Sequence, residues 1–497
     1  MNLLLSRFVR RMFTGRTPDY KRGLARAKCW IESNSTDEGV WFSSKHQQIY
    51  QEVTGYLIPT LIGVGERNRA FRWAESLLAC QRPDGAITNL NGTPYVFDTA
   101  QVMRGFLCCA GDERFRTALE RAADYLAATQ LPDGSFPDPY AGKIPTYIFL
   151  YCVEPWRRAA ETLGRPDLAE SARRCLDYYA ERFNPADFSA HSHFFGYAAE
   201  ALIDNGRGEL AAQALATAKR EIHRNGALNA AHGVHWICGP GQAQFAICFY
   251  KTGNLATGDR LLHWLMRHQL PSGGFLGAYG RGSHYFPDAV PSWSVKFFLD
   301  AVLWRIRRHF ELEFPSWMDA KEREHDFRLL AIRDVFDGLP ASARLLEIGC
   351  GNGRFLSQLR REFPAYEYHG LDLSSTLVAN LPDWMHGRQG DMMSLPYPSA
   401  MFDGVLMIES LEHAPDWKGA LDEALRVLKP GGRIAIVDKD ARQIWKGAIM
   451  PWEQWFEVQD VVIHLREKAT DVQAARLEGP ASGSQWPIFV LWSGIRR

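Results

Sequence analysis

A glycine-rich turn is the first feature of this sequence that could do chemistry. The stretch RLLEIGCGNGRF places Glu347 near the end of an apolar run and then sets Gly349, Gly351 and Gly353 at alternate positions. The apolar run predicts a buried strand, and the glycines predict a tight turn into a helix. A side chain would collide with a ligand where the backbone passes closest to it. The pattern therefore predicts a nucleotide-type cofactor site, which a dinucleotide-binding fold would also explain.

Two acidic residues end the next predicted strands. YHGLDLS ends an apolar run in Asp372, and GDMMSLPY carries Asp391 after a third run. From such a position a carboxylate can accept the hydroxyls of a ribose diol. A fourth strand is predicted after residue 403 and a fifth in RIAIVDKD, behind the glycine turn LKPGGR. This alternation predicts a Rossmann-like α/β domain.

The series resembles the class I S-adenosylmethionine-dependent methyltransferases over about residues 320–497. The resemblance implies that S-adenosylmethionine is the cofactor, with the glycine turn against its methionine part and Asp372 on the ribose. It also places Asp391 and Met392 beside the adenine, with Leu373 on the other adenine face. A dehydrogenase is the alternative, although LKPGGR and GDMMSLPY have no natural place in one. The full set of implied cofactor contacts is Glu347, Gly349, Gly351, Asn352, Gly353, Asp372, Leu373, Asp391, Met392 and Ile408.

Acids and a histidine follow the predicted fourth strand. In IESLEH, the spacing of Glu409, Glu412 and His413 would place them on one face of a helix. This E-x-x-E-H motif resembles that of ubiquinone-pathway O-methyltransferases and small-RNA terminal 2′-O-methyltransferases, which implies that the three side chains bind Mg²⁺ or another divalent metal. A fourth ligand could come from His464. The alternative is a metal-free site in which His413, with an ordinary pKa, takes a proton from an acceptor hydroxyl beside Glu412.

The sequence of residues 1 to about 310 predicts a different architecture, built from repeats. CQRPDGAI, TQLPDGSF and HQLPSGGF each follow an amphipathic stretch, and the glycine in each would end a helix. Nearly all-apolar segments alternate with the amphipathic ones, which predicts pairs of inner and outer helices. Six such helical hairpins would close into a ring, an all-α (α/α)6 toroid.

These three repeated segments resemble the repeats of terpenoid-cyclase and prenyltransferase-like toroids. The order of the predicted helices, over about residues 25–310, resembles the α/α barrels of glycan-processing enzymes. The acid and metal motifs of the cyclases, terpene synthases and prenyltransferases are absent from the sequence, so their chemistry is not implied. Aromatic, histidine and acidic residues in the loops before the inner helices suit the apolar face and hydroxyl rim of a sugar. The alternatives are that the aromatics cap the core and that the aspartate caps its helix. Candidate acceptor contacts are Trp236, Trp293, Tyr285, His191 and Asp98.

Length and composition indicate the number of domains, the kind of partner and the compartment. A chain of 497 residues predicts at least two domains, here residues 1–314 for the toroid and 315–497 for the methyltransferase. Because 57 basic residues balance 57 acidic ones, no overall field favours nucleic acid. Scattered cysteines and the lack of an apolar run of ~18 residues predict a cytoplasmic protein. The basic start MNLLLSRFVRRMFTGR is either an irregular terminus or a segment that lies on an anionic membrane surface.

Together these features favour a methyltransferase that O-methylates a glycan or glycan-like acceptor, such as a surface polysaccharide or its lipid-linked precursor, which the toroid recognises. A second hypothesis makes the toroid a separate epimerase, lyase or hydrolase of sugars. Its candidate acids are Glu52, Asp98, Asp138 and Asp288. A third hypothesis makes the toroid a scaffold for a protein partner.

Overall fold

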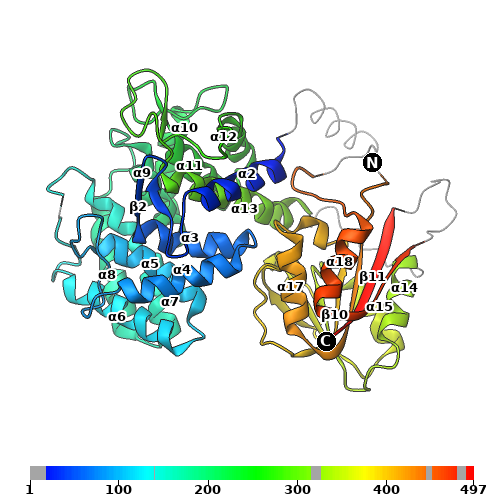
Figure 1. Cartoon of the computed structure of the whole chain (residues 1–497). Helices are drawn as coiled ribbons and strands as arrows, with labels where there is room; N and C mark the ends of the chain where they lie inside the picture. The colour runs from blue at the N-terminus through cyan, green and yellow to red at the C-terminus, as the bar shows by residue number, and fades with distance from the viewer. Residues whose placement is uncertain (1–17, 139, 315–325, 444–449, 478–487) are drawn as a thin grey trace. The chain divides into compact units, whose positions relative to one another are not determined.

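The computed structural model describes residues 18–138, 140–314, 326–443, 450–477 and 488–497 (Figure 1). The chain divides into two compact units, one made mainly of residues 22–305 and the other mainly of residues 306–497. The predicted boundary at residue 315 and the basic segment at the start of the chain lie outside the described residues. In the parts of the chain that the structure describes, no helix combines the length and apolar character that crossing a membrane requires.

The first unit is helical, with two short β-ribbons, β1–β2 (Trp41–Ser43 and His46–Ile49) and β3–β4 (Ile237–Cys238 and Ala278–Tyr279). Helices α3, α5, α9 and α11 are buried almost all round, whereas α4, α6, α8 and α12 bury one face. This difference matches the predicted alternation of inner and outer helices. The helices are α2 Tyr20–Ser33, α3 Gln51–Gly63, α4 Arg67–Cys80, α5 Val96–Cys109, α6 Glu113–Thr129, η1 Thr146–Cys152, α7 Val153–Leu163, α8 Pro166–Arg182, α9 Ser192–Asp204, α10 Gly208–Arg220, α11 Gly239–Lys251, α12 Leu255–Arg267 and α13 Ser292–Arg308.

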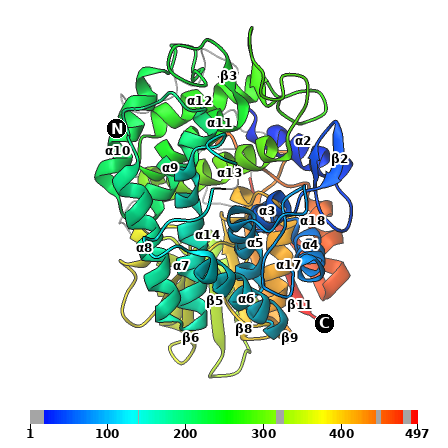
Figure 2. The same ribbon diagram turned by 90° about the vertical axis from the view of Figure 1, so that its left-hand side faces the viewer.

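Apolar helices that follow one another in sequence are neighbours in space. A Cβ added to Gly55 of α3 would lie 2.5 Å from the Cα of Val102 in α5, so glycine permits this close approach. Helix α5 contacts η1 and α7, η1 contacts α9, and α9 contacts α11. Figure 2 shows the region of α5, α7, α9 and α11. The last apolar helix also lies beside the first, because the Thr60 hydroxyl in α3 donates to Asp300 Oδ1 in α13 at 2.6 Å.

The repeated glutamine and glycine join neighbouring outer helices. Gln81 Nε2 donates to the carbonyls of Gly85 (3.0 Å) and of Ala118 in α6 (2.8 Å). Gly85 has a φ of +89°, and a Cβ there would lie 2.1 Å from the carbonyl oxygen of Arg121. The expectation that this glycine ends the helix is wrong, because α4 ends at Cys80 and the glycine turns the chain against the next outer helix. The equivalent pairs are Gln130 with Gly134, against α8, and Gln269 with Gly273, against α2.

The second unit is a seven-stranded sheet with the order β10-β11-β9-β8-β5-β6-β7. Strands β5 to β9 pair with one another in parallel, and β11 is antiparallel to both β9 and β10. A buried apolar cluster packs on each face. The Rossmann-like prediction is confirmed for this unit. Its strands are β5 Arg344–Ile348, β6 Glu367–Asp372, β7 His386–Gln389, β8 Phe402–Ile408, β9 Leu428–Lys439, β10 Ala469–Arg476 and β11 Phe489–Arg496. Its helices are η2 His309–Glu313, α14 Phe327–Phe336, α15 Arg354–Glu362, α16 Ser375–Val378, η4 Leu411–His413, α17 Trp417–Val427 and α18 Val458–Lys468.

Candidate functional site

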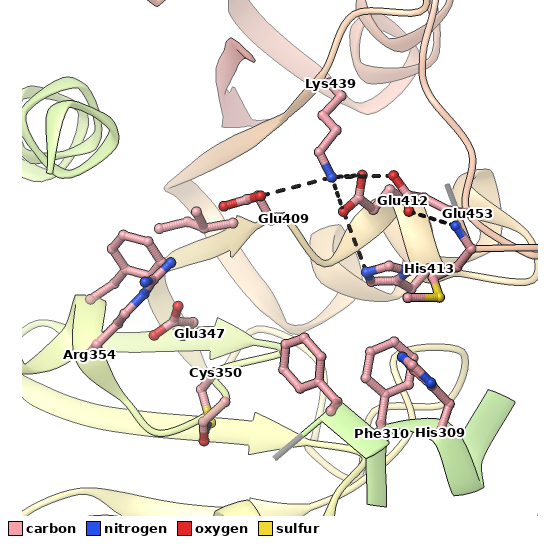
Figure 3. A pocket seen from close by; sticks show the side chains of 16 residues that line it. His309, Phe310, Glu347, Cys350, Arg354, Glu409, Glu412, His413, Lys439 and Glu453 are labelled. Carbon is pink, nitrogen blue, oxygen red and sulfur yellow. Dashed lines mark hydrogen bonds and ion pairs between the residues drawn. The ribbon is translucent and has the colours of Figure 1, made fainter. Parts of the chain in front are cut away.

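A cavity of about 390 Å³ lies at the carboxyl ends of β5, β8 and β9 (Figure 3). It brings the glycine turn after β5 and the E-x-x-E-H stretch after β8 to one place, although they are far apart in sequence. The lining residues are His309, Phe310, Phe314, Glu347, Gly349, Cys350, Gly351, Arg354, Phe355, Ile408, Glu409, Glu412, His413, Lys439, Met450 and Glu453.

The glycine turn needs glycine for conformation and for packing. Gly349, Gly351 and Gly353 have φ values of +78°, +55° and +74°, a region that side chains other than glycine rarely adopt. A Cβ at Gly349 would lie 2.5 Å from the Cβ of Ser410. The amide of Gly351 donates to Asp372 Oδ2 at 2.8 Å, which holds the turn against the end of β6.

Glu347 is buried at the head of this turn. Its side chain is 1% exposed, and its Oε2 has no hydrogen-bond partner within the described residues. Burial raises the pKa of Glu347 to about 8, and the charge of Arg354 opposes this rise. A cationic ligand in the cavity would pair with this carboxylate. S-adenosylmethionine, which carries an ammonium and a sulfonium group, fits such a site.

The other predicted cofactor residues lie beyond the cavity lining. Asp372 accepts from the amides of Gly351 and Ser374 at 2.8 and 2.9 Å, so its carboxylate keeps acceptor sites for two further donors. Asp391 accepts from the amide of Met393 at 2.9 Å and so stabilises the turn after β7. Six predicted contacts are absent from the lining and stay predictions: Asn352, Gly353, Asp372, Leu373, Asp391 and Met392.

The E-x-x-E-H stretch does not begin a helix. Strand β8 runs to Ile408, and the amide of Glu409 donates to the carbonyl of Val437 in β9 at 2.8 Å, which continues the sheet ladder. Glu409 has a φ of +49°, and only a short 3₁₀ turn over Leu411–His413 follows. The predicted arrangement on one helix face is therefore wrong.

A lysine lies among the acids of this stretch. Lys439 Nζ lies 2.6 Å from each carboxylate oxygen of Glu412, 3.3 Å from Glu453 Oε1 and 3.9 Å from Glu409 Oε2 (Figure 3). We name Lys439, Glu409, Glu412 and Glu453 the lysine cluster. Glu409 also pairs with Arg328. The ammonium and guanidinium groups thus pair with the carboxylates that the motif would offer to a metal, so the structure gives the metal site of Glu409, Glu412 and His413 no support and it stays a prediction.

The expected fourth metal ligand, His464, pairs with another residue. His464 Nε2 lies 2.9 Å from Asp422 Oδ1 in α17, so this ring is held away from the cavity and is not a fourth ligand. In the described part of the chain, the group of three potential ligands whose atoms lie within 4.8 Å of one another is Glu367, His369 and His386. These residues lie on β6 and β7, near the strand ends opposite to the cavity.

The pKa of His413 is lower than its residue type suggests. Burial lowers the pKa of His413 to about 3, Lys439 adds to this effect and Glu453 opposes it. The expectation of an ordinary pKa is wrong, because the ring is enclosed beside a cation. The Nδ1 atom is buried and has no hydrogen-bond partner among the described residues, and Nε2 lies 3.4 Å from Glu412 Oε1. The neutral ring offers a hydrogen-bond acceptor and is a weak base.

Several lining residues were not found from the sequence. Lys439 and Glu453 complete the lysine cluster, and His309, Phe310 and Phe314 come from the segment directly after α13. The one available signal was the lysine in VDKD, a cation among acids at the end of a buried strand. The aromatic segment gave no signal, because it was interpreted as a domain boundary.

The predicted acceptor residues lie in the helical unit, and four of them form a cluster. His191 contacts Tyr285 and Trp236, with ring centroids 4.3 and 5.2 Å apart, and Trp293 Nε1 donates to the Tyr285 hydroxyl at 2.9 Å. Both tryptophans are only 6% exposed, so they do not form an open rim. Asp98 is fully buried and is the third residue of α5, whose N-cap is residue 95. The interpretation of Asp98 as a helix cap is therefore wrong.

Comparison with known proteins identifies the second unit. Residues 346–436 match the family model of the methyltransferase domain. The 27-O-demethylrifamycin SV methyltransferase of Amycolatopsis mediterranei is 31% identical over 160 residues, which cover 28% of this chain and 57% of that protein. The fatty-acid O-methyltransferase of Mycolicibacterium smegmatis is 40% identical over 105 residues, or 20% of this chain and 38% of that protein. The phthiotriol/phenolphthiotriol dimycocerosates methyltransferase of Mycobacterium leprae is 37% identical over 148 residues, or 29% of this chain and 52% of that protein.

The chain thus spans about half of the length of these relatives, between 38% and 57%. The family model covers the strands that carry the glycine turn and the E-x-x-E-H stretch. Within the second unit, residues 346–436 are thus similar to the methyltransferase domain of known methyltransferases.

Proposed function

We propose that this protein transfers a methyl group from S-adenosylmethionine to a hydroxyl of a glycan-like acceptor. The observation that carries the proposal is the buried Glu347 at the head of the three-glycine turn, whose Oε2 has no hydrogen-bond partner among the described residues and which lies inside the segment that matches the methyltransferase domain. The cofactor supplies an activated methyl group when bound. Glu347 would balance its positive charge, and Asp372 would accept from its ribose hydroxyls.

The rest of the cavity would position the acceptor. The neutral ring of His413 presents an unpartnered Nδ1, which can accept a hydrogen bond from an acceptor hydroxyl and orient its oxygen. Glu412 is held by Lys439, so its role is to fix the charge of the lysine cluster and not to remove the proton. We propose that transfer needs no divalent metal, since both acids of the motif already have cationic partners.

For the helical unit we propose a closed (α/α)6 ring that recognises the acceptor. The neighbouring apolar helices support the ring, and the cluster of His191, Trp236, Tyr285 and Trp293 supports a sugar ligand. Two named relatives act on a fatty acid and on a dimycocerosate lipid. Phe310, Phe314 and Met450 give the cavity an apolar side. These two observations favour a lipid-linked form of the glycan over a free polysaccharide.

Calorimetry with S-adenosylmethionine tests the catalytic part. Glu347→Gln should bind the cofactor at least roughly tenfold more weakly than the wild type, as expected when a buried ion pair is lost. The matched control is Glu367→Gln, a partly exposed glutamate on the neighbouring strand β6, outside the cavity lining. It should bind as the wild type does. A wild-type protein that does not bind the cofactor would refute the proposal.

Mass spectrometry of surface glycans and lipid-linked glycans tests the acceptor. Cells that lack the gene should lose an O-methyl sugar, which the wild-type gene restores and the Glu347→Gln gene does not. If a methylated lipid without sugar is lost instead, the cofactor part stands and the glycan part is wrong.

A further inference from the structure

Two histidines and a glutamate lie together on β6 and β7 of the α/β sheet. Glu367 and His369 are the first and third residues of β6, so their side chains share one face of the strand. His386 is the first residue of β7, and it pairs with His369 in the parallel ladder between the two strands. The two imidazole rings contact each other, with centroids 4.8 Å apart and an angle of 30° between their planes. Strand geometry therefore brings the three side chains to one place.

Both rings place a nitrogen near the same carboxylate oxygen. His369 Nε2 lies 2.6 Å from Glu367 Oε1, and His386 Nε2 lies 3.9 Å from the same atom. Among the described residues, these three side chains each offer a ligand atom within 4.8 Å of the other two. In a tetrahedral zinc site with bonds of about 2.0–2.1 Å, neighbouring ligand atoms lie about 3.3 Å apart. The two observed separations lie on either side of this value, so shifts of less than about 1 Å would let all three atoms bind one ion.

Two of the three side chains are held in position, and the third is exposed. His369 is 7% exposed, and Phe402 packs edge-on against its ring, with centroids 5.1 Å apart. Arg344 Nε donates to Glu367 Oε2 at 3.1 Å, which leaves Oε1 for the two rings. Contacts of this kind orient the ligands of a metal site. The side chain of His386 is 62% exposed, so its ring can turn toward an ion without any change in the core.

The ligand types favour zinc over Mg²⁺, Ca²⁺ and Mn²⁺. Imidazole nitrogen suits zinc, whereas the other three ions prefer carboxylate, carbonyl and water oxygens. Two histidines and one glutamate form a ligand set that binds zinc and leaves a fourth position open. Since the side chains of Glu367 and His386 are 39% and 62% exposed, solvent can reach that position. Water can therefore be the fourth ligand.

The three side chains lie apart from the methyltransferase cavity, and they join the edge strand to its neighbour. None of them belongs to the cavity lining described above. Asp372, which contacts the glycine turn, is at the opposite end of β6 from Glu367. Strand β7 is the last strand of the sheet, and all four of its residues are exposed. An ion bound by His386 and by the two β6 residues would fasten this strand to the sheet.

We propose that Glu367, His369 and His386 form a zinc site that fastens β7 to β6. The ion would bind Nε2 of each histidine and Oε1 of the glutamate, with water as the fourth ligand. Zinc takes the place of the proton that His369 shares with Glu367, and that proton leaves the Nε2 atom. The site goes beyond the proposed methyl transfer and does not depend on it.

Calorimetry of the full chain with a zinc salt tests the binding. His386→Asn should bind zinc at least roughly tenfold more weakly than the wild type, since loss of a mere outer contact costs about 10–100-fold. Because His386 is exposed, this variant should keep the fold; Glu367→Gln should show the same loss. The matched control is His232→Asn, which removes a histidine that is 80% exposed and lies 2.8 Å from Glu221. It should bind zinc as the wild type does.

X-ray absorption at the zinc edge identifies the ligands. It should show nitrogen and oxygen at about 2.0–2.2 Å and no sulfur at about 2.3 Å, which separates this site from binding by cysteine. Zinc should also slow hydrogen exchange of the β7 amides in the wild type and not in His386→Asn, and Mn²⁺ at the same concentration should have no effect.

The proposal is overturned if the wild type binds no zinc, if His386→Asn binds zinc as the wild type does, or if sulfur ligates the ion. Unchanged exchange of the β7 amides in the zinc-bound wild type would overturn the fastening role. All of these variants should bind S-adenosylmethionine as the wild type does, so failure here is distinct from failure of the methyltransferase proposal.

Discussion

Replacing Lys439 with methionine should turn the lysine cluster into a site that needs a cation. In the wild type the ammonium lies 2.6 Å from both oxygens of Glu412 and 3.3 Å from Glu453 Oε1. Methionine has a similar length and no charge. The variant would leave Glu412 buried, at 3% side-chain exposure, among the charges of Asp438 and Glu453.

The expected loss is large for a single substitution. At a separation of roughly 3 Å, an effective dielectric constant of about 20 gives an attraction of roughly 5 kcal/mol for one ion pair. Removing one partner of a buried pair costs about 3–5 kcal/mol, and protonation of Glu412 limits the loss to this range. For a unit of this size, each kcal/mol lowers the melting temperature by about 2–4 °C. The variant should therefore melt at least about 6 °C lower at neutral pH.

Thermal unfolding with and without Mn²⁺ is the assay. Mn²⁺ should raise the melting temperature of Lys439→Met, because it replaces the lost ammonium among the carboxylates, and should leave the wild type unchanged. The control is Lys429→Met on the same strand, where the lysine is 40% exposed and pairs with Asp403 at 2.8 Å, so the loss should be at most about 1 kcal/mol. Equal melting temperatures of the two variants would refute the argument. So would methyl transfer by the wild type that stops with a chelator and returns with Mg²⁺.

Four further outcomes follow from the cofactor half of the cavity. S-adenosylmethionine affinity should rise with pH up to about 8, because a cation binds the ionised form of Glu347, whose pKa is raised from 4.5 to about 8; calorimetry that shows a flat profile would contradict this. For the same reason the unliganded unit should lose stability as the pH rises through that interval, and Glu347→Gln should not. Asp372→Ala should weaken cofactor binding by about 1.5–3 kcal/mol for each charged hydrogen bond lost, and unchanged affinity would disprove the ribose role. Gly349→Ala should lower the melting temperature, because its φ is +78° and the new Cβ would lie 2.5 Å from Ser410; an unchanged value would show that the turn adapts.

The α/β unit could be predicted from the sequence because its signals are local. Strands β5, β8 and β9 contain the apolar runs that the sequence shows, and the glycine turn after Ile348 has the positive φ values that its three glycines indicate. The E-x-x-E-H stretch could not be predicted in the same way. Whether Glu409 begins a helix or continues a strand depends on a hydrogen bond to Val437, which belongs to another strand. Residue spacing contains no information about that partner.

The protonation of His413 and of the acids in the helical unit depends on burial. Burial is set by residues that are distant in sequence. His413 loses its ordinary pKa because it is enclosed beside Lys439, a residue that belongs to a different strand. The sequence indicates Asp98 and Asp288 equally, yet Asp98 is fully buried and its carboxylate has no hydrogen bond within the described residues, whereas Asp288 is 72% exposed in an ion pair.

Among the acids of the helical unit, hydrogen bonds from nearby amide groups distinguish turn-forming carboxylates from buried carboxylates that lack such bonds. Asp138 is followed by a turn, and backbone N–H groups two and four residues later take up its carboxylate. Asp98 lies inside the first turn of an apolar helix, where no such bond to its side chain forms within the described residues. A buried aspartate that makes no hydrogen bond from the first turn of its helix is costly to the fold. This position, more than acidity or aromatic neighbours, is the sequence signal that would have selected Asp98 from the four candidates.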